Sequence, residues 1–226
     1  MLSRTQKLTP TEADPNYWIY DLGGSSDLSI DDFFYPDVQQ LINLFKTNQY
    51  SKLTFATKYV NPNLLNYSPN FSTRIRFSIM PEQIRKAVNL RTSKTQTIIS
   101  NLNNFYEAGY NVNINLAPVI IYPNWQQDYT NLLQDIVDNT STSFKKQLSF
   151  EIIFLTHNEW LHNVNLQWNS IGEEFLWQPE FQRTKISQYS KMVNKAYKKA
   201  YKEPALNWLK AQINQMIPES TIRYAF

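Results

Sequence analysis

Amine, hydroxyl and imidazole side chains lie near the ends of several predicted strands. Lys58 and Ser78 come at the ends of two of them, and His157 closes a later one. In barrels and parallel sheets such strand ends meet at one edge, where these folds build their binding sites. An amine there can bind a carboxylate as a point charge, and a hydroxyl can both donate and accept. From the residues alone we interpret Lys58 as a solvated strand-end lysine and Ser78 as an internally bonded serine, with a polar ligand site as the open alternative.

Two predicted strands carry a polar residue at every second position. One contains Arg74 and Arg76, and the other contains Asn111, Asn113 and Asn115. Because successive side chains of a strand point to opposite faces, one face of the sheet is expected to be polar. We interpret the asparagines as facing a polar interior. The two guanidiniums are expected either to bind cofactor or DNA phosphate, or to pair with a carboxylate of the barrel.

The 226 residues contain no cysteine and two histidines, His157 and His162. These residues therefore cannot form disulfides, thiolate nucleophiles, thiolate zinc sites or cysteine-held iron–sulfur clusters. No nucleophile, base and orienting group occur together, so we predict no catalytic residue and no metal site. We predict that His157 is a structural histidine hydrogen-bonded to the backbone, with a DNA or substrate contact as the alternative.

The most concentrated basic stretch runs from Arg183 to Lys202, within a chain of net charge +3 and pI about 8.9. Aromatic rings among cations are typical of nucleic-acid binders, in which bases stack on the rings and Lys or Arg hold phosphates. The alternative is a solvated helix face that carries its lysines outward. The predicted DNA-binding residues are Arg183, Lys185, Tyr189, Lys191, Lys195, Lys198 and Lys199.

Five short runs rich in β-branched and aromatic residues alternate with helical patterns, which indicates an α/β fold with a parallel sheet. The expected strands are residues 17–22, 52–58, 74–80, 111–121 and 148–155, with Ala117-Pro118 interrupting the fourth. The expected helices are residues 30–45, 94–108 and 125–137, the second capped by Gly109. Periodicity alone leaves an open sheet and a barrel equally favoured.

After Leu155 the alternation stops, and we expect a helix around residues 189–213 and one more strand over residues 221–226. The predicted divisions are a polar tail (1–15), a partial barrel (16–158) and a C-terminal extension packed on it (159–226). No run approaches the length of apolar sequence that a membrane span needs, and the first residues lack a signal-peptide core, so a cytoplasmic location is expected.

Seven short runs occur in an order and at spacings that resemble the spore photoproduct lyase family. They are Gly23-Gly24-Ser25-Ser26-Asp27, Phe55-Ala56-Thr57-Lys58, Arg74-Ile75-Arg76-Phe77-Ser78, Ala108-Gly109-Tyr110, Ala117-Pro118-Val119, Phe154-Leu155-Thr156-His157-Asn158 and Ile222-Arg223-Tyr224-Ala225-Phe226. The resemblance spans residues 16 to 226. It implies a radical S-adenosylmethionine enzyme on a partial (β/α)6-type barrel that repairs the methylene-bridged thymine dimer of ultraviolet-damaged DNA.

Two departures from the family pattern bear on this activity. Family members carry a first barrel strand and a Cys-x3-Cys-x2-Cys loop that holds a [4Fe–4S] cluster, and nothing in residues 1–15 matches them. In addition, Gly24 stands where the family has its hydrogen-donating cysteine. We therefore expect a barrel that lacks its first strand and has no cluster of its own.

Other family positions are retained in this sequence. By resemblance, Ser25, Lys58, Ser78 and Ala117 contact S-adenosylmethionine, and damaged DNA is the expected partner. The interpretation is a protein related to thymine-dimer repair lyases and inactive as an isolated chain. The alternatives are a catalytically silent DNA-binding or cofactor-binding remnant, and the second half of a split enzyme whose partner polypeptide carries the cysteines.

Overall fold

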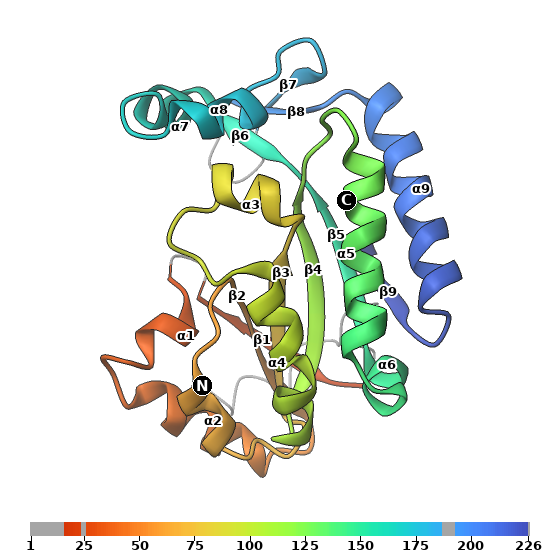
Figure 1. Ribbon diagram of the computed structural model, residues 1–226. Helices are drawn as coiled ribbons and strands as arrows, with labels where there is room; N and C mark the ends of the chain where they lie inside the picture. The colour runs from red at the N-terminus through yellow and green to blue at the C-terminus, as the bar shows by residue number, and fades with distance from the viewer. Residues whose placement is uncertain (1–15, 24–25, 187–192, 226) are drawn as a thin grey trace.

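The main element of the protein is a six-stranded parallel sheet with strand order β1-β2-β3-β4-β5-β9 (Figure 1). The computed structural model describes residues 16–23, 26–186 and 193–225. The strands of this sheet are β1 (Trp18–Leu22), β2 (Ser51–Thr57), β3 (Thr73–Ile79), β4 (Asn111–Val119), β5 (Ser149–Phe154) and β9 (Thr221–Ala225). The expected α/β architecture is confirmed, and the predicted last strand joins the sheet beside β5.

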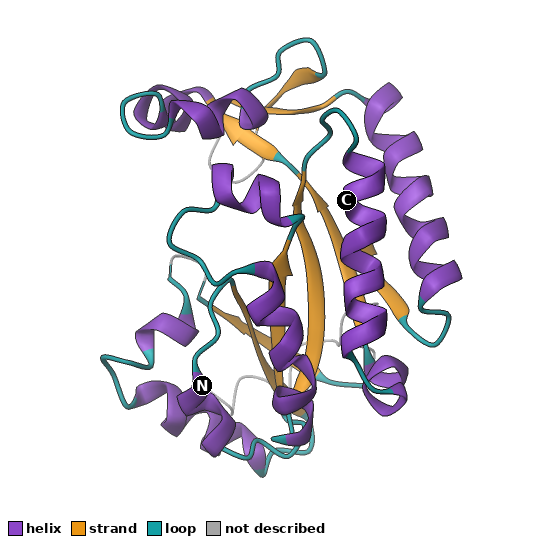
Figure 2. Cartoon of the chain, in the orientation of Figure 1, coloured by secondary structure: helices purple, strands orange, loops and turns teal. Residues whose placement is uncertain are grey.

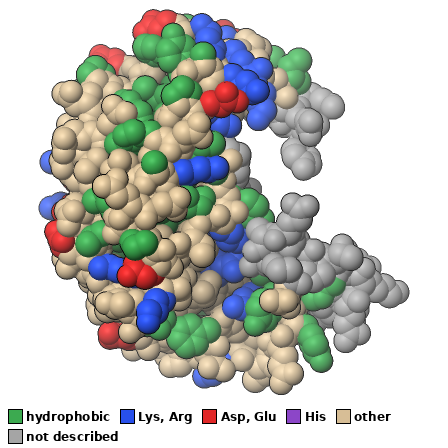
Figure 3. Space-filling model, turned by 90° about the vertical axis from the view of Figure 1, so that its right-hand side faces the viewer, with side chains coloured by type: hydrophobic (Ala, Val, Ile, Leu, Met, Phe, Trp, Pro, Cys, Tyr) green, Lys and Arg blue, Asp and Glu red, His purple; other side chains and the backbone are tan. Residues whose placement is uncertain are grey.

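Helices connect the strands, and the longest of them cover one face of the sheet. The helices are α1 (Leu28–Asp31), α2 (Asp37–Lys46), α3 (Glu82–Val88), α4 (Thr95–Glu107), α5 (Trp125–Asn139), α6 (Thr142–Gln147), α7 (Glu159–Asn165), α8 (Ser170–Leu176) and α9 (Lys199–Met216). The long helices α4, α5 and α9 lie side by side along that face (Figure 2). The other face lines a hollow on one side of the molecule (Figure 3).

The core forms between the sheet and these helices, as the alternation in the sequence predicts. Ile75 and Phe77 of β3 and Val112 and Ile114 of β4 are buried on the helix-covered side. The edge of the Phe77 ring packs on Phe105 of α4, with 5.0 Å between ring centroids. The apolar side chains of each strand therefore pack in the core on one face of the sheet, and the alternating polar side chains face the hollow on the other.

One local expectation differs from the structure. The segment 30–45 is not one helix, because Pro36 caps a separate helix, α2, and the side chain of Phe34 is 73% exposed. Ala117-Pro118 interrupts the fourth strand as expected, since the register of β4 against β5 shifts between Leu116 and Val119. Gly109 does follow α4 as predicted, with a φ of +94° that suits glycine.

A second, antiparallel sheet with order β6-β8-β7 lies beyond the end of β5. Its strands are β6 (Thr156–Asn158), β7 (Gln182–Ile186) and β8 (Val193–Tyr197), and α7 and α8 connect β6 to β7. The helix expected around residues 189–213 is therefore wrong over residues 193–197, which form β8, and the described helix begins at Lys199. Within the described residues, no helix is both long and apolar enough to cross a membrane.

Candidate functional site

A chain of charged side chains crosses the floor of the hollow from β1 to β9. Arg76 Nη2 of β3 lies 2.5 Å from Asp21 Oδ1 of β1, and Arg76 Nη1 lies 3.8 Å from Glu151 Oε2 of β5. Arg223 of β9 donates to the other oxygen of Glu151. Glu151 is buried, whereas Asp21 is 55% exposed at the rim. Arg76 therefore pairs with two carboxylates of the sheet, as one of the two predicted alternatives requires.

The asparagines of β4 extend this polar floor, and part of their hydrogen-bonding capacity is unused. Asn113 is fully buried, and neither its amide nitrogen nor its oxygen has a partner in the described part of the chain. The side-chain oxygen of Asn115 likewise has none among these residues. Buried amides without partners are costly, so a polar ligand or water that reached them would be stabilised. The prediction of an inward-facing asparagine row is confirmed.

The end of β2 is fastened to the loop that follows β1 by Asp27. Its carboxylate accepts from the Thr57 hydroxyl at 2.9 Å and from the Lys58 amide at 3.1 Å. The Lys58 amine donates to Asn89 Oδ1 at 3.0 Å. Burial lowers the pKa of Lys58, and the nearby Asp27 charge opposes that shift. The Lys58 amine is thus hydrogen-bonded to Asn89 and partly desolvated, rather than freely solvated.

The other predicted cofactor residues lie near the same edge. Ser78 is half-buried and pairs in register with Asn115, while Ala117 lies two residues further along β4. Thr57 pairs with Phe77, so Lys58, which directly follows β2, lies level with Ser78 near the end of β3. Ser25 and Gly24 lie outside the described residues. The sheet therefore brings Lys58, Ser78 and Ala117 to one edge, and their role there stays a prediction.

A basic pocket opens between the second sheet and the start of α9. It has a volume of about 290 Å³, and its cationic lining residues are Arg183, Lys185, Lys199 and Lys202. Burial and the nearby charges of Lys185 and Arg183 lower the pKa of Lys202. Like charges held around an open pocket favour an anion such as phosphate. Lysine and arginine side chains also gather on the rim above the hollow (Figure 3).

The predicted DNA-binding residues separate into two groups. Arg183, Lys185 and Lys199 line the pocket, although Lys199 also pairs with Glu203 at 3.2 Å. The Lys195 amine instead donates to Thr184, and the Lys198 amine donates to the Glu180 carbonyl. Tyr189 and Lys191 lie outside the described residues. Lys202, which the sequence places at the end of the basic stretch, joins the pocket because α9 begins beside β7.

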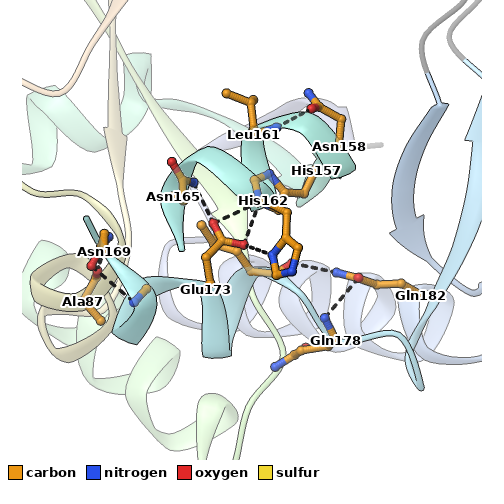
Figure 4. A network of polar contacts seen from close by, with 12 residues as sticks. Ala87, His157, Asn158, Leu161, His162, Asn165, Asn169, Glu173, Gln178 and Gln182 are labelled. Atoms are coloured by element: carbon orange, nitrogen blue, oxygen red, sulfur yellow. Dashed lines mark hydrogen bonds and ion pairs between the residues drawn. The ribbon is translucent and has the colours of Figure 1, made fainter. Parts of the chain in front are cut away.

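The two histidines share a carboxylate near the second sheet (Figure 4). His157 of β6 and His162 of α7 both direct a ring nitrogen at Glu173 of α8. His157 Nε2 therefore has a side-chain partner where a backbone partner was predicted. A cysteine-held cluster does not fit this chain, because its 226 residues include no thiolate donor and both of its imidazoles point to Glu173.

Comparison with known proteins places these features in a family. A family model described as spore photoproduct lyase matches residues 2–226. The chain is 35% identical over 117 residues to the spore photoproduct lyase of Clostridium acetobutylicum, covering 51% of this chain and 34% of that protein. It is 26% identical over 143 residues to the spore photoproduct lyase of Bacillus subtilis, covering 63% of this chain and 42% of that protein. The matches thus span less than half of these relatives.

Solved structures agree with this relationship at the level of the fold. A spore photoproduct lyase complexed with dinucleoside spore photoproduct has a TM-score of 0.88 at 19% identity, covering 100% of this chain and 64% of that one. A mutant with bound AdoMet and dinucleoside spore photoproduct has a TM-score of 0.87 at 19% identity, with the same coverage. The expected partial barrel fold is therefore confirmed.

Proposed function

The chain belongs to the spore photoproduct lyase family, and from that membership we propose that it provides the cofactor-binding and DNA-binding part of a thymine-dimer repair lyase. These residues alone do not start the radical reaction, since they supply no thiolate for an iron–sulfur cluster. The observation that carries the proposal is the polar hollow, whose buried Asn113 and Asn115 groups lack partners among the described residues. This hollow lies beside a pocket with four cationic side chains.

S-Adenosylmethionine is the ligand that this edge of the hollow fits. The cofactor carries a carboxylate, an ammonium group, hydroxyls and an adenine, which together need both donors and acceptors. Lys58 would hold its carboxylate, and Ser78 and the backbone of Ala117 would hold its ribose and adenine. When bound beside a reduced cluster the cofactor supplies a carbon radical, and the present residues would only bind and orient it. Calorimetric titration of the purified chain with S-adenosylmethionine is expected to show binding that Lys58→Met weakens.

DNA would enter along the basic pocket. Replacing Arg183, Lys185 and Lys202 with Gln is expected to weaken binding of a fluorescent oligonucleotide at every sequence. It is also expected to reduce the slope of log affinity against log salt by up to about three contacts' worth. The matched control replaces three exposed lysines elsewhere, Lys46, Lys94 and Lys146, so that the net charge changes equally. Equal losses in the two triple variants would contradict a specific phosphate site.

The split-enzyme alternative is distinguished by reconstitution. A cysteine-bearing N-terminal segment from a relative, with its cluster assembled, would be mixed with this chain and with S-adenosylmethionine. Restored reductive cleavage of the cofactor would favour a chain that completes an enzyme. Repair of the methylene-bridged thymine dimer is then expected to stay inefficient until Gly24→Cys supplies a hydrogen donor. Binding of DNA without any binding of cofactor would favour a silent DNA-binding protein instead.

A further inference from the structure

Two histidines and one glutamate from three separate elements converge near the second sheet (Figure 4). His157 Nε2 of β6 lies 3.0 Å from Glu173 Oε2 of α8, and His162 Nδ1 of α7 lies 2.5 Å from the same oxygen. The three candidate ligand atoms all lie within 4.8 Å of one another. We propose that His157, His162 and Glu173 bind a divalent transition-metal ion of the zinc type, a site outside the polar hollow and the basic pocket.

The donor set and its spacing suit such an ion. Two imidazole nitrogens and one carboxylate oxygen form a common three-ligand zinc site, with water in the fourth position. Donors bound about 2.0 to 2.1 Å from one ion lie roughly 2.9 to 3.4 Å apart. The His157–Glu173 separation of 3.0 Å falls within this range. His162, at 2.5 Å, needs to withdraw by about 0.4 Å, and its side chain is 16% exposed and so not fully enclosed.

The surroundings hold the carboxylate and the rings in the orientation that a metal needs. The Asn165 amide donates to Glu173 Oε1 at 2.6 Å. His157 Nε2 lies between the two oxygens, 3.1 Å from Oε1 and 3.0 Å from Oε2, and His162 Nδ1 faces Oε2. The ring of His162 stacks on Trp177 at 4.2 Å between centroids and 12° between planes. His157 meets the same indole edge to face at 6.0 Å. Such outer contacts fix the direction of ligand atoms and raise metal affinity.

An ion at this position would stabilise a part of the fold that has little apolar support. None of the described residues of α7 is buried, and Trp160 within it and Trp168 just after it are 69% and 63% exposed. The ligands come from β6, α7 and α8, so one ion would join both helices to the strand that pairs with β8. Metal ions commonly replace a hydrophobic core in small substructures of this kind. The role we infer for the ion is therefore structural.

Titration of the purified chain with Zn²⁺ alone, in competition with a chromophoric chelator, tests the site. One ion per chain is expected to bind, and Co²⁺ is expected to give visible absorption bands of an imidazole-bound ion. His162→Phe, which keeps a ring on Trp177, and Glu173→Gln, which keeps the volume, are each expected to abolish tight binding. Asn165→Leu is expected to weaken it by about 10- to 100-fold. The matched control is Glu174→Gln, at the exposed neighbouring carboxylate of α8, which is expected to bind as the parent does.

Two histidines in the whole chain make a direct spectroscopic test available. With ¹⁵N-labelled histidine, Zn²⁺ is expected to shift the Nε2 signal of His157 and the Nδ1 signal of His162 together, at one equivalent. Amide exchange in α7 and α8 is expected to slow, while exchange in α4 stays unchanged. Unshifted imidazole signals, or Zn²⁺ binding that survives in both His162→Phe and Glu173→Gln, would overturn the proposal. If His162→Phe fails to fold by circular dichroism, Glu173→Gln and the histidine signals of the parent decide it.

Discussion

Replacing Glu151 with Gln tests whether the charged chain across the hollow behaves as a buried network. Glu151 is 3% exposed and lies between Arg76 and Arg223, whose side chains are 13% and 10% exposed. Removing its charge leaves two largely buried guanidiniums without their shared carboxylate. Breaking a buried ion pair in this way costs about 3 to 5 kcal/mol. Because Gln keeps one carbonyl acceptor for Arg223, we expect the lower end, about 3 kcal/mol.

The expected loss is large enough to measure by urea and thermal unfolding. For a domain of this size each kcal/mol lowers the melting temperature by about 2 to 4 °C, so Glu151→Gln is expected to lower it by about 6 to 12 °C. Asp21→Asn is the control on the same network, because Asp21 is 55% exposed and its pair with Arg76 is screened by water. An exposed pair is worth about 0 to 1 kcal/mol, which predicts a shift of less than about 4 °C.

A double variant separates the network from a simple loss of packing. If Glu151 and Arg223 act together, then Glu151→Gln combined with Arg223→Gln is expected to cost less than the sum of the two single changes. A loss of stability in Glu151→Gln no larger than that in Asp21→Asn would contradict a buried network. That result would mean that water in the hollow solvates both guanidiniums as well as the carboxylate does.

Three further predictions concern acid stability, cluster assembly and the sheet edge. A hydrogen bond from Arg85 is the main cause that lowers the pKa of Glu82 from 4.5 to about 2, so its stabilising effect is present above about pH 4.5 and is lost as the pH falls towards about 2. Glu82→Gln is therefore expected to lower the urea midpoint near pH 7 but not near pH 2, and equal differences at both pH values would contradict this. The chain supplied with iron and sulfide without oxygen is expected to stay colourless, since no cysteine is present, and a stoichiometric visible absorbance would contradict it. In the described residues β1 pairs with β2 alone, so its free edge is expected to cause self-association or capture of a relative's N-terminal segment, which light scattering at rising concentration measures.

The strands of the main sheet could be predicted because their alternation has a single physical cause. In β3 and β4 the apolar residues face the helices and the polar ones face the hollow, so the alternation in the sequence follows the two faces of the sheet, although Asn113 and Asn115 are themselves buried. The basic stretch from Arg183 to Lys202 has no such alternation of apolar and polar residues from which its strands could be predicted. Val193 to Tyr197 lies among lysines at helical spacing, but pairing with β6 and β7 makes it a strand. Tertiary pairing of this kind overrides local preference.

The candidate site was predictable only where its residues belong to one strand or one strand end. Lys58 and Ser78 follow from their position on the strands. Glu151 and Arg223 do not, since they meet across 72 residues through a register that the sequence does not display. The partnership of Glu173 with the two histidines was missed for the same reason, because α7, α8 and β6 approach one another only in the folded chain.

The position of β9 beside β5 has a consequence for the order in which the protein folds. Ser149 pairs with Thr221, so the sheet gains its last described strand only after α7, α8, the second sheet and α9 have been synthesised. Until then β5 presents an open strand edge, and Glu151 lies beside Arg76 without the second guanidinium. Contacts between residues this far apart in sequence form slowly, because the intervening chain must lose conformational entropy before the contacts can stabilise it. A nascent chain thus passes through a stage in which the unpaired edge of β5 can pair with another chain. Binding by a chaperone at that stage would prevent aggregation.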